Sequence, residues 1–117
     1  MSNYKHIDTE LLKEVADGNN ELILDLVDMY IEQAPKFSEQ LENLLENKDY
    51  QTLSKLAHKI KGSLSTVGIT MLAQEMKELE QKAKLNSNTE QYPTYINRYK
   101  RISNEAIVEL KDIITRL

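Results

Sequence analysis

Apolar side chains recur along most of the chain at spacings of three and four residues, which is the period of one face of an α-helix. Five such amphipathic segments follow one another, and short polar or glycine-containing breaks separate them. Strong helix formers dominate the composition, and the glycine and proline that many hairpins would need are few. The pattern therefore predicts an all-α protein with five helices, of which the first is short.

The first segment is expected to be a short helix that Asp8 caps and that Gly18 closes in a left-handed turn. A longer helix then begins at the asparagines 19–20. Its stripe keeps helical spacing through Pro35, so this is either one kinked helix over about 20–47 or two nearly coaxial pieces that meet at the proline. The apolar positions of the two segments are Ile7, Leu11, Leu12, Val15, Ile23, Leu26, Val27, Tyr30, Ala34, Phe37, Leu41 and Leu44.

Three further helices are expected. Asp49 can cap the third and Gly68 can end it; the fourth covers Ile69 to Ala83, residues 85–91 form a loop, and Pro93 suits the first turn of the last helix. Their remaining apolar positions are Leu53, Leu56, Ala57, Ile60, Leu64, Val67, Leu72, Ala73, Met76, Leu79, Tyr95, Tyr99, Ile102, Ala106, Leu110, Ile113 and Leu117. Four long amphipathic segments with short connections predict an antiparallel up-and-down four-helix bundle, with the additional N-terminal helix at one end.

Composition narrows the functional classes. A length of 117 residues predicts a single domain over 1–117, and the absence of cysteine excludes disulfides, thiolate metal sites and a cysteine nucleophile. The net charge of -4 argues against nucleic acid as a partner. No apolar run is long enough for a membrane span, and the first twenty residues are too polar for a secretory signal. We therefore expect a cytoplasmic protein.

One histidine occupies an unexpected position on the third helix. At about 100° per residue, His58 points about 140° away from the centre of the apolar face, toward solvent. Gly62 lies one turn further on, although glycine inside a helix costs about 1 kcal/mol relative to alanine. The polar or small residues that surround His58 on this exposed side are Lys55, Lys59, Lys61, Gly62 and Ser65.

These neighbours favour a specific chemistry. The lysines disfavour a charged imidazolium and would attract an anion, and the missing side chain at Gly62 leaves room for another molecule. An exposed neutral imidazole in such surroundings suits covalent acceptance of a phosphoryl group at His58. The alternative is an ordinary surface histidine on a solvated face. Metal binding is not expected, because His6 is remote in sequence and the lysines repel cations.

The stretch from Ala57 to Gly68 resembles the signature of histidine phosphotransfer (Hpt) domains, and the resemblance covers about residues 20–84. The positions that match the signature are His58, Ile60, Lys61, Gly62, Ser63 and Gly68. Two positions depart from it: Leu64 stands where the family often has a small residue and Ile69 where it often has alanine. Because Leu64 falls on the apolar face, we expect the core to repack around it without loss of activity.

The resemblance implies a phosphorelay carrier that has no ATP site of its own. Such a domain takes a phosphoryl group from the aspartate of a receiver domain and passes it to another receiver aspartate. The Mg²⁺ ion belongs to the receiver, so no cofactor is expected here. Carried over to this sequence, His58 would be the phosphoacceptor, Lys61 would neutralise phosphoryl charge, and Gly62 would leave room for the docked partner.

Glu80 lies near the apolar face of the fourth helix. The resemblance implies that it accepts a hydrogen bond from the ring of His58 and fixes its tautomer. The alternative is that Glu80 turns to solvent or pairs with Lys77 or Lys84.

Two other functions remain open at the level of the sequence. The chain could be a noncatalytic helical adaptor that binds receivers without taking a phosphoryl group, or the phosphoacceptor domain of a chemotaxis-type kinase. The partners expected are receiver domains and a hybrid sensor kinase, and the protein is expected to be a monomer. The sequence does not indicate which receivers are cognate or which signal is relayed.

Overall fold

The computed structural model describes residues 4–117, which are helical apart from short connections and contain no strand. The expected single domain included residues 1–3, which lie outside the described part. The elements are α1 (Thr9–Val15), α2 (Asn20–Glu46), α3 (Tyr50–Thr66), α4 (Thr70–Lys84), the 3-10 helix η1 (Thr89–Gln91) and α5 (Tyr92–Thr115).

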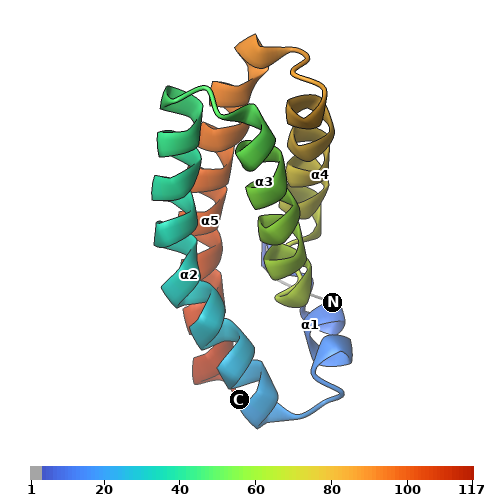
Figure 1. Ribbon diagram of the computed structural model, residues 1–117. Helices are drawn as coiled ribbons and strands as arrows, with labels where there is room; N and C mark the ends of the chain where they lie inside the picture. Colours follow the sequence, from blue (N-terminus) through green and yellow to red (C-terminus); the bar gives the residue numbers. More distant parts are fainter. Residues whose placement is uncertain (1–3) are drawn as a thin grey trace.

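The four long helices form an antiparallel bundle. Along the chain, α2, α3, α4 and α5 alternate in direction, and each packs against its neighbours in sequence while α5 returns to α2 (Figure 1). The contact between α3 and α4 is the most extensive. The molecule measures 42 × 21 × 20 Å. The predicted up-and-down bundle is therefore confirmed.

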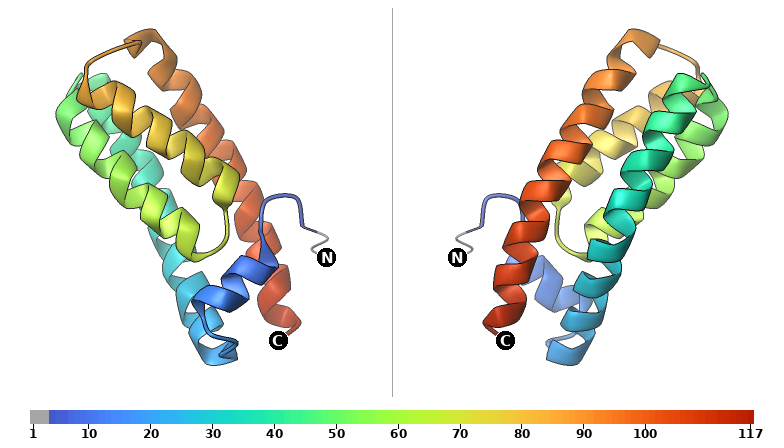
Figure 2. Two further views of the ribbon diagram at one scale, coloured as in Figure 1. Left: turned by 90° about the vertical axis from the view of Figure 1, so that its right-hand side faces the viewer. Right: turned by 90° about the vertical axis from the view of Figure 1, so that its left-hand side faces the viewer.

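The short helix α1 completes the bundle at one end. α2 and α5 have 27 and 24 residues, whereas α3 and α4 have only 17 and 15. The longer pair extends past the turn between α3 and α4, and α1 lies in the remaining space beside their ends (Figure 2). Ile7, Leu12 and Ala16 are buried there. This is the place the sequence indicated for a short first helix.

The ends of the helices follow the capping signals in the sequence. Asp8, Asn19 and Asp49 each accept a hydrogen bond from the backbone amide three residues further on, which satisfies one of the free amides of the first turn. Gly18 has a φ of +70° after α1. α2 continues through Pro35 as one helix, so of the two alternatives the single helix is correct.

Some expected core positions are not buried. Val15 and Leu117 are exposed: Val15 is the last residue of α1, which buries little besides Leu12, and Leu117 lies beyond the end of α5. Five other positions are only half-buried because they face the margins of the bundle: Leu11, Leu26, Leu44, Leu56 and Tyr95. The stretch 85–91, expected to be a loop, contains the single turn η1.

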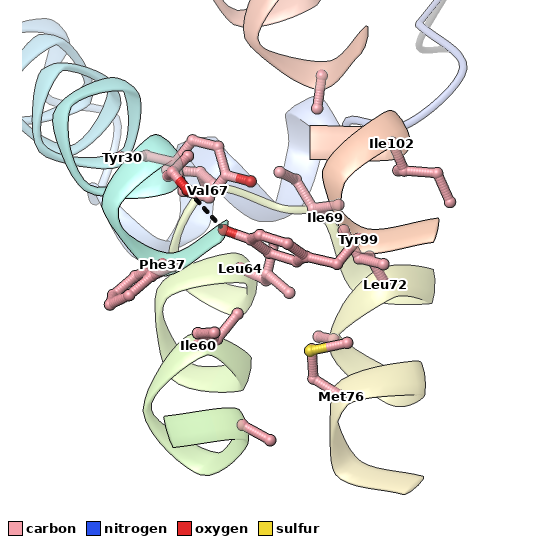
Figure 3. Packing of buried hydrophobic residues seen from close by; sticks show 14 of the residues in the cluster. Tyr30, Phe37, Ile60, Leu64, Val67, Ile69, Leu72, Met76, Tyr99 and Ile102 are labelled. Atoms are coloured by element: carbon pink, nitrogen blue, oxygen red, sulfur yellow. Dashed lines mark hydrogen bonds between the residues drawn. The ribbon is translucent and has the colours of Figure 1, made fainter. Parts of the chain in front are cut away.

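The core holds a buried polar contact between α2 and α5. The hydroxyl groups of Tyr30 and Ser103 lie 2.7 Å apart. The Tyr99 ring crosses the core from α5 toward α2, above Leu72 of α4 (Figure 3). Burial raises the pKa of Tyr30 to about 12 and raises that of Tyr99 as well.

The raised pKa values of these tyrosines predict that the protein loses stability in alkali. Between pH 10 and 12 the unfolded chain releases a proton that folded Tyr30 retains, so the free energy of unfolding falls as the pH rises. One such tyrosine contributes a slope of about 1.4 kcal/mol per pH unit. Urea unfolding across this pH range should show the decline, and Tyr30→Phe should make it shallower. An unchanged slope in the variant would contradict the assignment.

The segment before α1 is fixed to α5 by a row of carboxylates. The Tyr4 hydroxyl donates to Asp112 (2.6 Å), the His6 backbone amide donates to Glu109 (2.9 Å), and the His6 ring contacts Glu105 through Nε2 (2.9 Å). The hydrogen bond from His6 lowers the pKa of the Glu105 carboxyl. His6 is therefore engaged by carboxylates of α5.

The same segment contacts the turn between α3 and α4 at Gly68. The Asp8 amide donates to the Gly68 carbonyl (2.9 Å), and Gly68 has a φ of +80°. A Cβ at Gly68 would lie 2.6 Å from the Asp8 carbonyl oxygen. The second glycine of the sequence motif is thus required by backbone conformation and by the close approach of another segment.

We expect Gly68→Ala to lower the free energy of unfolding by about 3 kcal/mol, because the left-handed conformation and the steric overlap with Asp8 both act against it. Gly18→Ala is the matched control. Gly18 also has a positive φ, but a Cβ there would meet nothing within 4 Å, so its cost is about 1 kcal/mol. Equal effects of the two substitutions in chemical denaturation would contradict the role given to the contact at Asp8.

Candidate functional site

The candidate site centres on His58, near the middle of α3. The buried residues Ala57 and Ile60 fix this part of the helix against the core. The side chain of His58 retains 65% of its accessible surface. The imidazole therefore projects from a rigid element into solvent, as its angle on the helix indicated.

One nitrogen of the ring is held by a carboxylate from the neighbouring helix. Nδ1 of His58 lies 3.0 Å from Oε2 of Glu80 on α4, and the Glu80 side chain is 24% exposed. Of the alternatives that the sequence left open for Glu80, the structure has the contact with the imidazole and not a pairing with Lys77 or Lys84. The long glutamate side chain reaches across the edge of the α3–α4 interface to an imidazole that points away from the core.

Lys61 lies one turn after His58 and shares the same carboxylate. Its Nζ is 3.4 Å from Oε1 of Glu80 and 3.5 Å from Nδ1 of His58. An ammonium group and a ring N–H are both donors, so the approach of Nζ to Nδ1 is not a hydrogen bond once Nδ1 carries its hydrogen. The two oxygens of Glu80 thus hold one donor each, and the Lys61 side chain is only 29% exposed.

This arrangement favours one tautomer of His58. An ionised carboxylate only accepts hydrogen bonds, so Glu80 favours the hydrogen on Nδ1. In the neutral imidazole the other nitrogen, Nε2, then has a free lone pair. The nitrogen that Glu80 does not hold is therefore the one that can act as a nucleophile.

Gly62 leaves an open space beside His58. A Cβ at this position would have no atom within 4 Å, so the packing of this protein does not require glycine here. The Gly62 carbonyl accepts a hydrogen bond from the Thr66 hydroxyl (2.9 Å) within α3. Any residue other than glycine would place its side chain in the space next to the imidazole.

The other residues singled out in the sequence do not gather around the ring. Lys55 and Lys59 line a groove between α2 and α3, and the Lys59 ammonium lies 5.9 Å from the centre of the Phe37 ring. Ser65 lies with Lys61 in a shallow groove on the α4 side. The lysines therefore divide between the two sides of α3, and Lys61 is the one that contacts the pair formed by His58 and Glu80.

Two site contacts were not anticipated from the sequence. The Ser54 hydroxyl donates to the backbone carbonyl of Glu80 (2.8 Å), and the Gln51 amide donates to that of Lys84 (3.2 Å). Together with His58, these residues form a polar row on the side of α3 that faces α4. Their spacing of three and four residues was the available signal, and it became informative only once the neighbouring helix was known.

The described residues contain no group of three or more histidine, cysteine, aspartate or glutamate side chains that could hold a metal ion. Within the same part of the chain, no helix combines the length and the apolar character that crossing a membrane requires.

Comparison with known proteins is consistent with this geometry. The sequence model of the Hpt domain matches residues 25–117. A curated relative, Multistep phosphorelay regulator 1 of Schizosaccharomyces pombe, is 32% identical over 78 residues, which are 67% of this chain and 26% of that protein. The chain thus matches about a quarter of the length of this relative.

Two solved structures have the same fold. Histidine-containing phosphotransfer protein B from Pseudomonas aeruginosa PAO1 has a TM-score of 0.87 at 25% identity, with 96% of each chain covered. The Hpt domain of a sensor hybrid histidine kinase from Shewanella has a TM-score of 0.82 at 19% identity, with 95% of each chain covered, and shows the fold alone. A family match over most of the chain, on a bundle that exposes one histidine, leads to one conclusion: the chain belongs to the Hpt domain family, the histidine phosphotransfer carriers of two-component signalling.

Proposed function

We propose that His58 is the phosphoacceptor of this carrier, and that it takes a phosphoryl group from a receiver aspartate and passes it to the aspartate of another receiver. The observation that carries the proposal is the contact between Nδ1 of His58 and Glu80, on a ring that is 65% exposed. It leaves Nε2 as the free and reachable nucleophile.

The proposed transfer balances without an external proton donor. The Nε2 lone pair attacks the phosphorus of the aspartyl phosphate, the N–P bond forms as the P–O bond breaks, and the aspartate carboxylate leaves with the electron pair. Nδ1 keeps its hydrogen throughout, and the carboxylate of Glu80 offsets the positive charge of the phosphorylated ring. Attack by a second aspartate on the same phosphorus reverses these steps.

Lys61 and Gly62 have distinct proposed roles. Phosphoryl transfer proceeds through a loose transition state with negative charge on the equatorial oxygens, where a nearby ammonium group is stabilising. Lys61, already within 3.5 Å of the imidazole, supplies that charge. Gly62 leaves the space in which the loops around a receiver aspartate approach the ring.

The remaining chemistry is assigned to the partners. We propose that this chain has no ATP site and no cofactor of its own, and that the receiver contributes the Mg²⁺ ion. The net charge of -4 supports a protein partner in place of nucleic acid or an anionic membrane. We further propose that residues 1–117 form one domain and act as a monomer in the cytoplasm, and the continuous core from Ile7 to Ile113 supports a single domain.

The test is incubation with a receiver domain phosphorylated in the presence of Mg²⁺. We expect rapid appearance of an acid-labile phosphoryl group on the carrier, and its loss when an unphosphorylated second receiver is added. Labelling only by a histidine kinase with ATP would indicate the phosphoacceptor domain of a chemotaxis-type kinase. Binding of receivers without any phosphoryl uptake would indicate an adaptor, and either result would overturn the proposal.

A further inference from the structure

We propose that Ser54 is a positioning residue: its hydroxyl fixes the main chain of Glu80, so that the Glu80 carboxylate can hold Nδ1 of His58. The consequence for phosphoryl transfer rests on the function proposed above. The effect on the imidazole itself does not, because it concerns the unphosphorylated protein.

Ser54 lies one turn before His58 on α3, on the side that faces α4. Its Oγ donates to the Glu80 carbonyl at 2.8 Å, and the residue is only 8% exposed. Glu80 is thus held at two points by the same helix. Ser54 holds its backbone, while His58 and Lys61 hold its two carboxylate oxygens.

The hydroxyl of Ser54 is not needed to satisfy a free carbonyl. Glu80 lies four residues before the end of α4 (Thr70–Lys84), so its carbonyl is within reach of the amide of Lys84 in the regular helical ladder. The bond from Ser54 is an additional one between two helices. Its structural effect is to set how α4 lies against α3 at the level of the active imidazole.

The hydrogen bond between His58 and Glu80 depends on this placement of α4, and it tolerates only a small displacement. Nδ1 and Oε2 lie 3.0 Å apart, and a hydrogen bond is essentially lost beyond about 3.5 Å. A shift of α4 by about half an ångström is therefore sufficient to weaken it. Gln51 ties α3 to α4 one turn earlier, but that bond is exposed to water, whereas the bond of Ser54 lies in surroundings of lower dielectric constant, where it is stronger.

The molecule offers a matched control in Ser103. Its hydroxyl is also buried and also links two long helices, through the hydroxyl of Tyr30. It joins α2 to α5, away from His58. Ser54→Ala and Ser103→Ala each remove one hydroxyl and one interhelical hydrogen bond. A change in the His58 ring that occurs only in Ser54→Ala therefore reflects the position of Ser54 beside Glu80.

The experiment is nitrogen-15 NMR of the histidine rings in the unphosphorylated protein, at a pH where His58 is neutral. We expect the wild-type ring to be mainly the Nδ1–H form, Ser54→Ala to shift it toward a mixture of both tautomers, and Ser103→Ala to leave it unchanged. Phosphoryl uptake from a receiver should fall about fivefold in Ser54→Ala, the factor that corresponds to one net hydrogen bond.

An unchanged tautomer in Ser54→Ala would overturn the proposal, and so would equal shifts in both variants, which would indicate a general loosening of the bundle. These outcomes are separate from a failure of the proposed function. If the wild-type protein took up no phosphoryl group, the ring spectra would still decide whether Ser54 positions Glu80.

Discussion

Replacement of His58 by glutamine is expected to abolish the acid-labile phosphoryl label that a phosphorylated receiver places on the wild-type protein. Glutamine has a similar reach and polarity, but its amide nitrogen has no available lone pair and cannot form the N–P bond. The side chain is 65% exposed, so the substitution should leave the fold intact. The measurement is transfer of radiolabelled phosphate, with circular dichroism to verify helicity.

His6→Gln is the control for this experiment, since His6 is the other histidine of the chain. Its ring contacts Glu105 on α5 and its side chain is 11% exposed. We expect His6→Gln to be labelled at the wild-type rate. Labelling of His58→Gln at that rate, or loss of labelling in His6→Gln with the fold retained, would contradict the assignment of the phosphoacceptor.

Gly62→Gln is expected to separate stability from activity. The substitution replaces a poor helix former and enters open space, so the free energy of unfolding should rise by about 0.5–1 kcal/mol. Transfer from a phosphorylated receiver should nevertheless fall by about 10- to 100-fold. A misplacement of the reacting atoms by about 1 Å costs a factor of this order.

A small phosphodonor tests whether Gly62→Gln loses activity because the receiver can no longer dock. Phosphoramidate needs no docked protein surface, so it should label Gly62→Gln at close to the wild-type rate. Gly62→Ala, with the smallest side chain, should lie between the wild-type protein and Gly62→Gln in receiver-dependent transfer. Wild-type transfer in Gly62→Gln would remove the argument that this glycine provides room for the partner.

The bundle could be predicted from the sequence because its signals are local and repeated. The caps at Asp8, Asn19 and Asp49 and the stops at Gly18 and Gly68 agree with the periodic stripes on the helices they delimit. The errors fall where local signals carry less information. Periodicity assigns a face to every apolar residue, but it does not reveal that a seven-residue helix or a chain end has too few neighbours to bury it.

The features of the candidate site likewise fall into those that one helix determines and those that depend on how two helices pack. The exposure of His58 and the open space at Gly62 follow from positions on one helix, so the helical angle was sufficient to predict them. The contacts of Glu80 and Ser54 depend on how α3 and α4 lie against each other. Spacing along the chain does not contain that information, so the first remained an open alternative and the second was missed.

The most direct test of the central claim is to identify which ring nitrogen carries the phosphoryl group. Phosphorus-31 and nitrogen-15 NMR of the phosphorylated protein should show a single phosphohistidine at His58, bonded through Nε2, with the hydrogen retained on Nδ1 beside Glu80. A phosphoryl group on Nδ1, or on any residue other than His58, would contradict the account.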